Sequence, residues 1–310
     1  MKVVTKSNSR KAKSIKEFLY ILPCIIIVLI FAYYPLYGWV YAFFDYQPPI
    51  PLSESPFVGF KWFYSLVADQ VKVNEILKVI RNTFAMSGLS IAFSWLPMVF
   101  AVFLNELRCR PFQKFVQTVT TLPNFISWVL VYAIAFCMFN STGMANSVLT
   151  DMGAITKPIM FLQESNPGKV WWEMWLWLTW KNLGWAAIMY LAALAGIDQE
   201  LYEAARVDGA TRMQQIWYIT FPCLLPTFFV LLMLSIASFL SNGMEQYFVF
   251  QNAFNRDSIQ VLDLYVFNIA MNSGAYSVSA VLSMLKTLIS VVLLVFANWL
   301  SKTVRGESFI

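Results

Sequence analysis

Long apolar segments, separated by shorter polar ones, set the pattern of this chain of 310 residues. An α-helix needs about 20 predominantly apolar residues to cross the hydrocarbon core of a bilayer. Six segments meet that requirement and are predicted to span a membrane: 18–44, 82–104, 118–139, 170–194, 221–243 and 277–300. The predicted fold class is therefore an all-α integral membrane protein with six transmembrane helices.

One polar insert, residues 198–222, interrupts the apolar pattern of the second half. It carries four charged side chains within ten positions, at Glu203, Arg206, Asp208 and Arg212. Because so many charges cannot enter a bilayer cheaply, this segment has to lie in water. Two short helices are expected in it. Asp198 caps the first, and Gly209 ends it in a left-handed conformation. Asp208 or Thr211 begins the second, and Pro222 begins the span that follows.

The insert also carries a motif at fixed offsets: Glu203-Ala204-Ala205, then Asp208-Gly209-Ala210, with Ile219, Pro222 and Pro226 beyond. Together these residues resemble the EAA loop of binding-protein-dependent ABC importer permeases, and the carbohydrate type among them. A Glu-Ala-Ala run alone would be common in a helical linker, but the whole motif between two expected spans is specific. In the family this loop docks on the ATPase subunit. The resemblance therefore implies ATPase coupling for Glu203, Ala204, Ala205, Asp208, Gly209 and Ala210.

The resemblance covers essentially the whole chain and implies a type I ABC importer permease fold. It implies four partners around this subunit, namely a homologous second permease, two ABC ATPase subunits and an extracytoplasmic sugar-binding protein. Oligosaccharides would cross the bacterial plasma membrane by alternating access. ATP and Mg would be bound by the ATPase subunits, so no cofactor is expected in this chain.

Two details refine the resemblance. The aromatic first span and residues 57–60 look most like the subgroup that serves polysaccharide and oligosaccharide fragments. Asp198 stands where many relatives have proline, and Ile216 replaces the usual phenylalanine. These departures leave the class unchanged, but packing in the ATPase groove is expected to differ in detail.

Composition agrees with a membrane protein, because 59% of the residues are hydrophobic and 13% are charged. With the N-terminus inside, the inner segments hold 13 Lys and Arg and the outer segments hold 6. The positive-inside rule then predicts both termini in the cytoplasm. Residues 1–17 are expected to be a basic cytoplasmic segment, and 18–310 the permease domain. The net charge of +5 results from this asymmetry and does not indicate nucleic-acid binding.

The residue types present argue against catalysis by this chain. It has no histidine, and its four cysteines are isolated, so neither a usual zinc site nor a His-based triad is expected. No stretch matches the P-loop that binds ATP. The alternative function is a polytopic membrane enzyme, such as a sugar or acyl transferase. It would need clustered acids or a nucleophile with a base, and no such pattern is present, so no catalytic residue is assigned.

Deep polar groups in the third and fourth spans are candidates for the substrate path. Lys181 lies about ten residues inside its span, and an ionisable group at that depth is by default functional. Tryptophans surround it at helical spacing, and their faces suit sugar rings. The candidates here are Trp177, Trp180, Lys181 and Asn182, with Asn124 and Trp128 beside Pro123 in the third span. The alternatives are a packed kink at Pro123 and a structural lysine held by a carboxylate or by cation–π contact.

The fifth span carries a second polar face. Ser235, Ser238, Asn242 and Glu245 stand at offsets 0, 3, 7 and 10, which would place them along one side of a helix. Such a face needs water, a partner helix or substrate opposite it. These four residues complete the predicted substrate path. Glu245 as the counter-charge of Lys181 is the alternative interpretation, and Lys286 adds a polar group to the sixth span.

Overall fold

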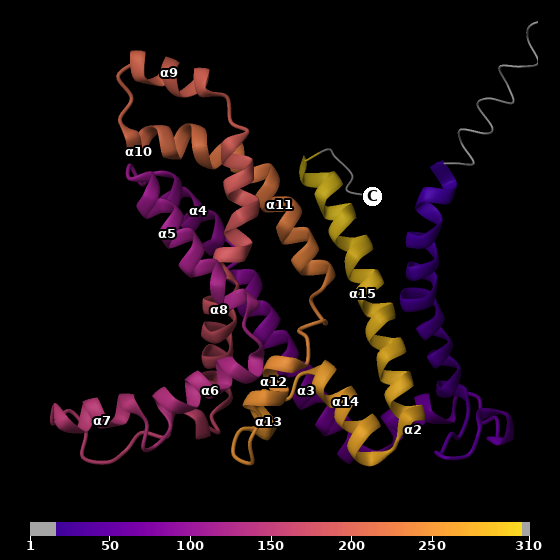
Figure 1. The fold of residues 1–310 in the computed structure, drawn as a ribbon. Helices are drawn as coiled ribbons and strands as arrows, with labels where there is room; N and C mark the ends of the chain where they lie inside the picture. Colours follow the sequence, from indigo (N-terminus) through magenta and orange to yellow (C-terminus); the bar gives the residue numbers. More distant parts are fainter. Residues whose placement is uncertain (1–16, 306–310) are drawn as a thin grey trace, which may run out of the picture. The chain divides into compact units, whose positions relative to one another are not determined.

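The computed structural model describes residues 17–305, which are almost entirely helical (Figure 1). Within these residues, β-type pairing is confined to an isolated bridge between Phe44 and Phe57. The all-α prediction is confirmed. The basic N-terminal segment predicted for 1–17 lies outside the described residues, except for Glu17. The described chain divides into two compact units, 17–68 with Ile269–Met284, and Asp69–Asn268 with 285–305.

The first unit begins with an apolar helical stretch. It is α-helical over 17–28, then π-helical in η1 (Leu29–Tyr33) and 3₁₀-helical in η2 (Tyr34–Phe43). The 3₁₀ segment η3 (Leu52–Glu54) and helix α2 (Lys61–Ala68) follow. Ser277 ties the end of η2 to the start of the last helix: its Oγ donates to Phe44 O at 2.7 Å and accepts from Tyr46 N at 3.2 Å.

The second unit holds most of the helices. In chain order they are α3 (Gln70–Ala92), α4 (Leu96–Asn105), α5 (Arg110–Thr121), η4 (Leu122–Phe125), α6 (Trp128–Phe139), α7 (Met144–Asp151), η5 (Phe161–Gln163), α8 (Pro167–Ala195), α9 (Gln199–Val207), α10 (Arg212–Gln215), η6 (Ile216–Thr220), α11 (Phe221–Ala237), α12 (Glu245–Phe250) and α13 (Arg256–Ile259). Two further helices, α14 (Leu262–Ser273) and α15 (Tyr276–Arg305), contribute residues to both units.

Within residues 17–305, five helical stretches are long and apolar enough to cross a membrane. They are Glu17–Phe43, Gln70–Asn105, Trp128–Asp151, Arg212–Ala237 and Tyr276–Trp299. Helix α8, which covers the predicted span 170–194, has 29 residues but is not among the five. Its tryptophans, six of the twelve in the chain, contribute little to hydropathy. The count of six spans and the cytoplasmic position of both termini therefore remain predictions.

In three predicted spans the helix is interrupted by non-helical residues or ends early. Between α3 and α4 the chain turns at Phe93–Trp95, so Pro97 lies in the first turn of a new helix. Between α5 and α6 it passes through η4 and an extended segment at Ile126 and Ser127. Helix α11 ends at Ala237, short of the predicted Gly243, which has a φ of +77°. Each break leaves backbone polar groups that other side chains have to satisfy.

Helix α8 connects the two halves of the core of this unit. Val170 and Met174 near its start belong to one buried cluster, which includes Val131 of α6 and Phe250 of α12. Ala187, Tyr190 and Leu194 near its end belong to another, with Met98, Ala101 and Val102 of α4 and Leu224 of α11. Gly184 lets α5 approach closely, because a Cβ there would lie 2.3 Å from Thr120 O.

Candidate functional site

The polar loop folds as two short capped helices. Asp198 begins α9, its Oδ1 accepting from Glu200 N at 3.0 Å. At the other end Ala210 N donates back to Ala205 O at 2.8 Å, which requires the φ of +79° found at Gly209. Thr211 begins α10 with a capping box, in which Gln214 N and Thr211 N each bond the other residue's side chain. The prediction of two helices with these caps is confirmed, and Thr211 is the cap of the second.

No break separates the loop from the span that follows. The chain is helical from Arg212 through η6 into α11, and Phe221 N donates to Ile216 O, five residues back. Pro222 lies in the first turn of α11, as predicted, but α11 continues directly from η6, so the proline does not follow a break in the helix. A π-helical turn precedes this proline and changes the register of backbone hydrogen bonds, so its missing N–H is accommodated within a continuous helix.

Side-chain contacts anchor the loop to the core helices. Arg212 Nη1 donates to Glu106 Oε2 at the end of α4, at 3.1 Å. The hydroxyls of Tyr202 and Thr220 are 3.0 Å apart and join α9 to the end of η6. Tyr202, Ile216 and Ile219 also pack against the cluster that contains Ile197 and Leu224. Because polar and apolar contacts act together, the loop is attached to α4, α8 and α11.

The outer face of the loop is exposed and partly apolar. Of the predicted coupling residues, Glu203, Ala204, Asp208 and Gly209 are exposed, whereas Ala205 and Ala210 are half-buried. Val207 is 89% exposed, and Leu201, Met213, Trp217 and Tyr218 are also large apolar side chains in contact with solvent in this chain. Apolar surface of this extent on a charged loop is typical of a docking surface.

Lys181 lies at the break between η4 and α6. Its side chain is buried, with 7% of the residue exposed. The ammonium donates to Pro123 O at 3.2 Å and to Asn124 O at 2.7 Å, and it lies 5.4 Å from the centre of the Trp128 ring. Its partners are therefore backbone carbonyls and an aromatic ring. Pro123 O also accepts from Ile126 N at 3.1 Å, so the ammonium is a second donor to that carbonyl.

The neighbours of Lys181 divide into two groups. Asn124 Nδ2 donates to Asn182 Oδ1 at 3.0 Å, so both amides join the same break. Trp177 packs between Phe139 and Phe250, with ring centres 6.0 and 5.9 Å away. In contrast, Trp180 is 43% exposed. The structure thus brings together Lys181, Asn182, Asn124 and Trp128, and it leaves Trp180 accessible.

The predicted polar face of the fifth span does not run along one helix, because α11 ends at Ala237. Ser235 and Ser238 are exposed, and their hydroxyls donate to Leu231 O and Leu234 O. Asn242 lies in the turn that follows and accepts from Ser87 Oγ at 3.0 Å. Glu245 is exposed at the first position of α12. The single helical face was wrong, although three of its four residues are accessible.

An ion pair that the sequence did not indicate stabilises this turn. Asp263 of α14 pairs with Lys286 of α15, and each side chain is 19% exposed. The second oxygen of Asp263 accepts from Gly243 N at 3.0 Å. Lys286 stood out as a charge in an apolar span, but Asp263 lies in a shorter segment with no distinguishing pattern. Only the fold brings the two together.

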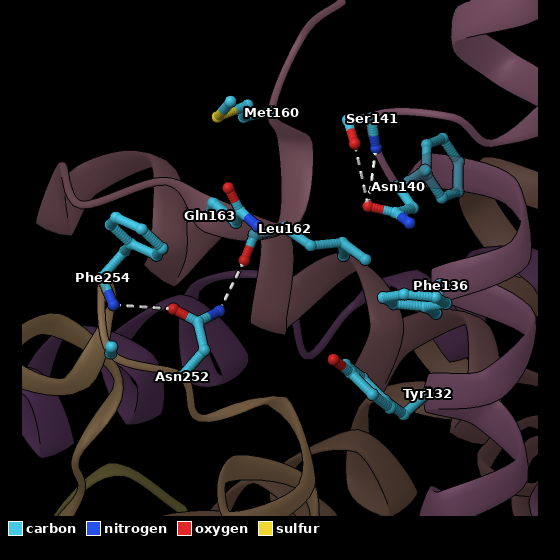
Figure 2. A pocket seen from close by; sticks show the side chains of 11 residues that line it. Tyr132, Phe136, Asn140, Ser141, Met160, Leu162, Gln163, Asn252 and Phe254 are labelled. Carbon is cyan, nitrogen blue, oxygen red and sulfur yellow. Dashed lines mark hydrogen bonds between the residues drawn. The ribbon is translucent and has the colours of Figure 1, made fainter.

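A pocket of about 290 Å³ opens where α6 ends (Figure 2). Aromatic and amide side chains dominate its lining, which consists of Tyr132, Phe136, Phe139, Asn140, Ser141, Met160, Leu162, Gln163, Asn252, Ala253 and Phe254. Asn252 closes one side, donating to Leu162 O at 2.7 Å and accepting from Phe254 N at 2.9 Å. Sequence reasoning missed this pocket because three separate segments form it.

Among the described residues, no group of three or more His, Cys, Asp or Glu side chains is placed to hold a metal ion. The four cysteines are free and exposed. The arrangement therefore consists of an anchored, exposed loop, a broken-helix junction around Lys181 and an accessible polar edge on α11. Such an arrangement suits the binding of a partner by the exposed loop and the movement of the helices to which the loop is attached.

Comparisons with known proteins agree on one family. The model for "Binding-protein-dependent transport system inner membrane component" matches residues 94–306. Protein LplB of Bacillus subtilis (strain 168) is 35% identical over 94% of this chain and 89% of its own. The polygalacturonan/rhamnogalacturonan transport system permease protein YteP, from the same organism, is 35% identical over 98% of this chain and 95% of its own.

Solved structures give the same result. A chain of a bacterial ABC transporter involved in the import of the acidic polysaccharide alginate matches with a TM-score of 0.83 and 32% identity, over 96% of this chain and 99% of that chain. A second structure contains the bacterial alginate ABC transporter in complex with an alginate pentasaccharide-bound periplasmic protein. Its TM-score is 0.82 at 31% identity, with 96% of this chain and 98% of that chain covered.

Proposed function

We infer the function from one premise: this chain belongs to the family of binding-protein-dependent transport system inner membrane components. It is the permease subunit of an ABC importer and an integral membrane protein. The alternative of a membrane-bound transferase finds no support in the family, in the relatives or in the solved structures. ATP hydrolysis is proposed to belong to partner ATPase subunits.

The proposed substrates are oligosaccharides released from polysaccharides. Among these, oligosaccharides that contain uronates are proposed to be preferred. The observation that carries this proposal is the match over nearly the whole chain to the alginate importer subunit. YteP, named for polygalacturonan and rhamnogalacturonan, supports the same class. Two relatives named for arabinooligosaccharides are less similar, at 28% and 26% identity. The order of similarity therefore favours acidic over neutral chains.

Coupling to ATP hydrolysis is proposed to run through the loop from Asp198 to Pro222. The ATPase would grip its exposed face, in which Glu203 and Val207 are accessible. Because the chain is helical without interruption from Arg212 to Ala237, displacement of the loop would move α11 as one body. ATP binding and hydrolysis would thereby alternate the access of the substrate path, provided that nucleotide and substrate favour different states.

The substrate path is proposed to follow the exposed polar edge of α11 and α12, formed by Ser235, Ser238 and Glu245. Trp180 offers an accessible aromatic face on α8. Lys181, Asn182, Asn124 and Trp128 are proposed to form the wall behind this path, since their polar groups already contact one another or backbone carbonyls. In this proposal the path residues contact the substrate, whereas the four residues around Lys181 hold the wall in place.

Uptake by the reconstituted importer tests the proposal. The chain is incorporated into proteoliposomes with its second permease, ATPase subunits and binding protein, and accumulation of labelled oligosaccharides is measured. We expect uptake that requires both ATP and binding protein, with oligouronates preferred to neutral oligosaccharides of the same length. A preference for neutral chains would overturn the substrate proposal alone. Uptake without ATP, or conversion of the sugar without uptake, would overturn the importer mechanism.

A further inference from the structure

Helix α7 has an apolar face that the described chain does not cover. Met144 and Val148 of the helix and Met152, the residue that caps its C-terminus, are spaced i, i+4 and i+8, which places them on one side. They are exposed by 63%, 47% and 76%. Half-buried Ala145 and Leu149 widen this face, whereas exposed Ser147 and Thr150 lie toward the opposite side and exposed Asp151 lies at the edge beside Met144. The helix is therefore amphipathic, with both faces accessible.

One polar side chain fixes the edge of α7 against the protein. Asn146 is 2% exposed. Its amide nitrogen donates to Asn140 O and Ile159 O, both at 2.9 Å, and its oxygen accepts from Ile159 N at 2.8 Å. Because these three bonds join both ends of the segment that contains α7, the orientation of the helix about its own axis is set. The apolar face cannot turn inward to bury itself.

The position of α7 places that face at the membrane boundary. It follows α6 after a turn of four residues, and the apolar stretch Trp128–Asp151, long enough to cross a membrane, includes both helices. Helix α6 presents exposed apolar side chains of its own, including Val129, Leu130 and Ile134. Figure 1 shows α7 near the beginning of α8 and running crosswise to it. Helix α7 therefore does not continue along the axis of α8.

We propose that α7 lies in the headgroup layer of the bilayer, with Met144, Val148 and Met152 in the lipid. The apolar surface of α6 continues into this face, so one lipid contact covers both. Ser147 and Thr150 then face water, as in interfacial helices that bury one side a few ångströms below the headgroups. Such an anchor holds the segment beside the pocket at a fixed depth, and it goes beyond the transport function proposed above.

Nitroxide accessibility tests this placement. The assembled importer, with its native cysteines replaced and its transport activity confirmed, is placed in nanodiscs of phosphatidylcholine and phosphatidylglycerol. Single cysteines at Met144, Val148, Met152, Ser147 and Thr150 are spin-labelled. Collisions with oxygen, which is enriched in lipid, are compared with collisions with a water-soluble nickel chelate. We expect the ratio to be several-fold higher at the first three positions than at the last two.

A matched pair of variants adds a second measurement. Val148→Glu and Ser147→Glu introduce the same charge at adjacent positions. With the label at Met144→Cys, we expect Val148→Glu to lower the collision ratio toward its value in water and Ser147→Glu to leave it unchanged. Only complexes that elute as intact assemblies are compared, so a failure to fold cannot mimic the effect.

Two outcomes would overturn the proposal. Equal access of the nickel chelate to all five positions would place α7 in water. Protection of Met144, Val148 and Met152 from both reagents, appearing only when the binding protein is added, would assign the apolar face to a protein contact. Neither outcome would affect uptake by the importer, so the two proposals are tested separately.

Discussion

At the scale of single residues, Lys181 illustrates how a buried charge can be explained by the backbone around it. The expected partners were substrate, a carboxylate or an aromatic ring. The structure gives the ammonium two carbonyl oxygens at 3.2 and 2.7 Å and the ring of Trp128. Those carbonyls belong to Pro123 and Asn124, where a helix is interrupted. A lysine at this position thus donates to Asn124 O and adds a second donor to Pro123 O, which also accepts from Ile126 N.

Replacement of this lysine tests the structural interpretation. We expect Lys181→Met to destabilise the complex by about 1–3 kcal/mol, because buried acceptors lose their donor. Lys181→Arg keeps the charge and donors and is expected to cost less. Thermal unfolding of the detergent-solubilised importer measures the stability, and uptake is normalised to assembled complex. Loss of normalised uptake at unchanged thermal stability would mean that Lys181 contacts the substrate instead.

At the scale of helices, local patterns were predictable and long-range pairings were not. The caps at Asp198, Gly209 and Thr211 followed from neighbouring residues, and the structure contains them. The helix class followed from the lengths of the apolar segments. In contrast, the contact of Lys181 with Pro123 joins residues 58 positions apart, and Asp263 meets Gly243 across 20. Periodicity carries no information on such pairs, because it describes one helix at a time.

The continuity of helices was also mispredicted for a physical reason. A proline usually marks a helix start, but at Pro222 a π-helical turn absorbs the missing donor and the helix continues. Conversely, the turn at Phe93–Trp95 lies within an apolar stretch that was predicted to be one continuous span. Hydropathy reports where the chain is apolar, whereas the backbone register depends on packing against other helices.

The loop helix α9 offers a charge-reversal test of coupling. We expect Glu203→Lys to leave the importer assembled in the membrane but to abolish uptake and sugar-stimulated ATP hydrolysis, since it reverses an exposed charge on the face that docks. Glu200→Lys makes the same change one turn earlier in α9. It is expected to cost only about 0.3–1 kcal/mol from the helix dipole and to retain transport. Normal uptake by Glu203→Lys would contradict the coupling mechanism.

The contact between α5 and α8 makes a second prediction at this scale. A Cβ at Gly184 would lie 2.3 Å from Thr120 O, so we expect Gly184→Ala to separate the helices and destabilise the subunit by about 1–3 kcal/mol. Gly88 in α3 has no atom within 4 Å of its Cβ position. Gly88→Ala should therefore be neutral or stabilising by about 0.5–1 kcal/mol. Unfolding midpoints of the two variants, measured side by side, decide between close packing and a general intolerance of added methyl groups.

At the scale of the whole molecule, the orientation in the membrane remains to be measured. The distribution of Lys and Arg predicts that the segment between α4 and α5, and the loop between α8 and α11, face the cytoplasm. The segment that contains α7 would then face the exterior. The distribution is a property of the whole chain, and no single loop decides it.

Thiol labelling of intact cells tests this orientation directly. Cys109 is exposed between α4 and α5. We expect a membrane-impermeant maleimide to leave Cys109 unlabelled until the cells are permeabilised. A cysteine introduced at exposed Thr142, in a background without other cysteines, should be labelled in intact cells. The reverse labelling pattern would place the Glu203 loop outside, where no ATPase could reach it.

The unbroken helix between Arg212 and Ala237 has a mechanical consequence. Its 26 residues form a rod of about 39 Å, which contains Pro226, is anchored at its base by the Arg212–Glu106 bond and ends at Ala237. Insertion of one residue into such a rod would swing everything beyond it by about 100° around the axis. The loop end and the Ser235 end of this helix are therefore coupled in rotation, so a change in length between them alters the orientation of one end relative to the other.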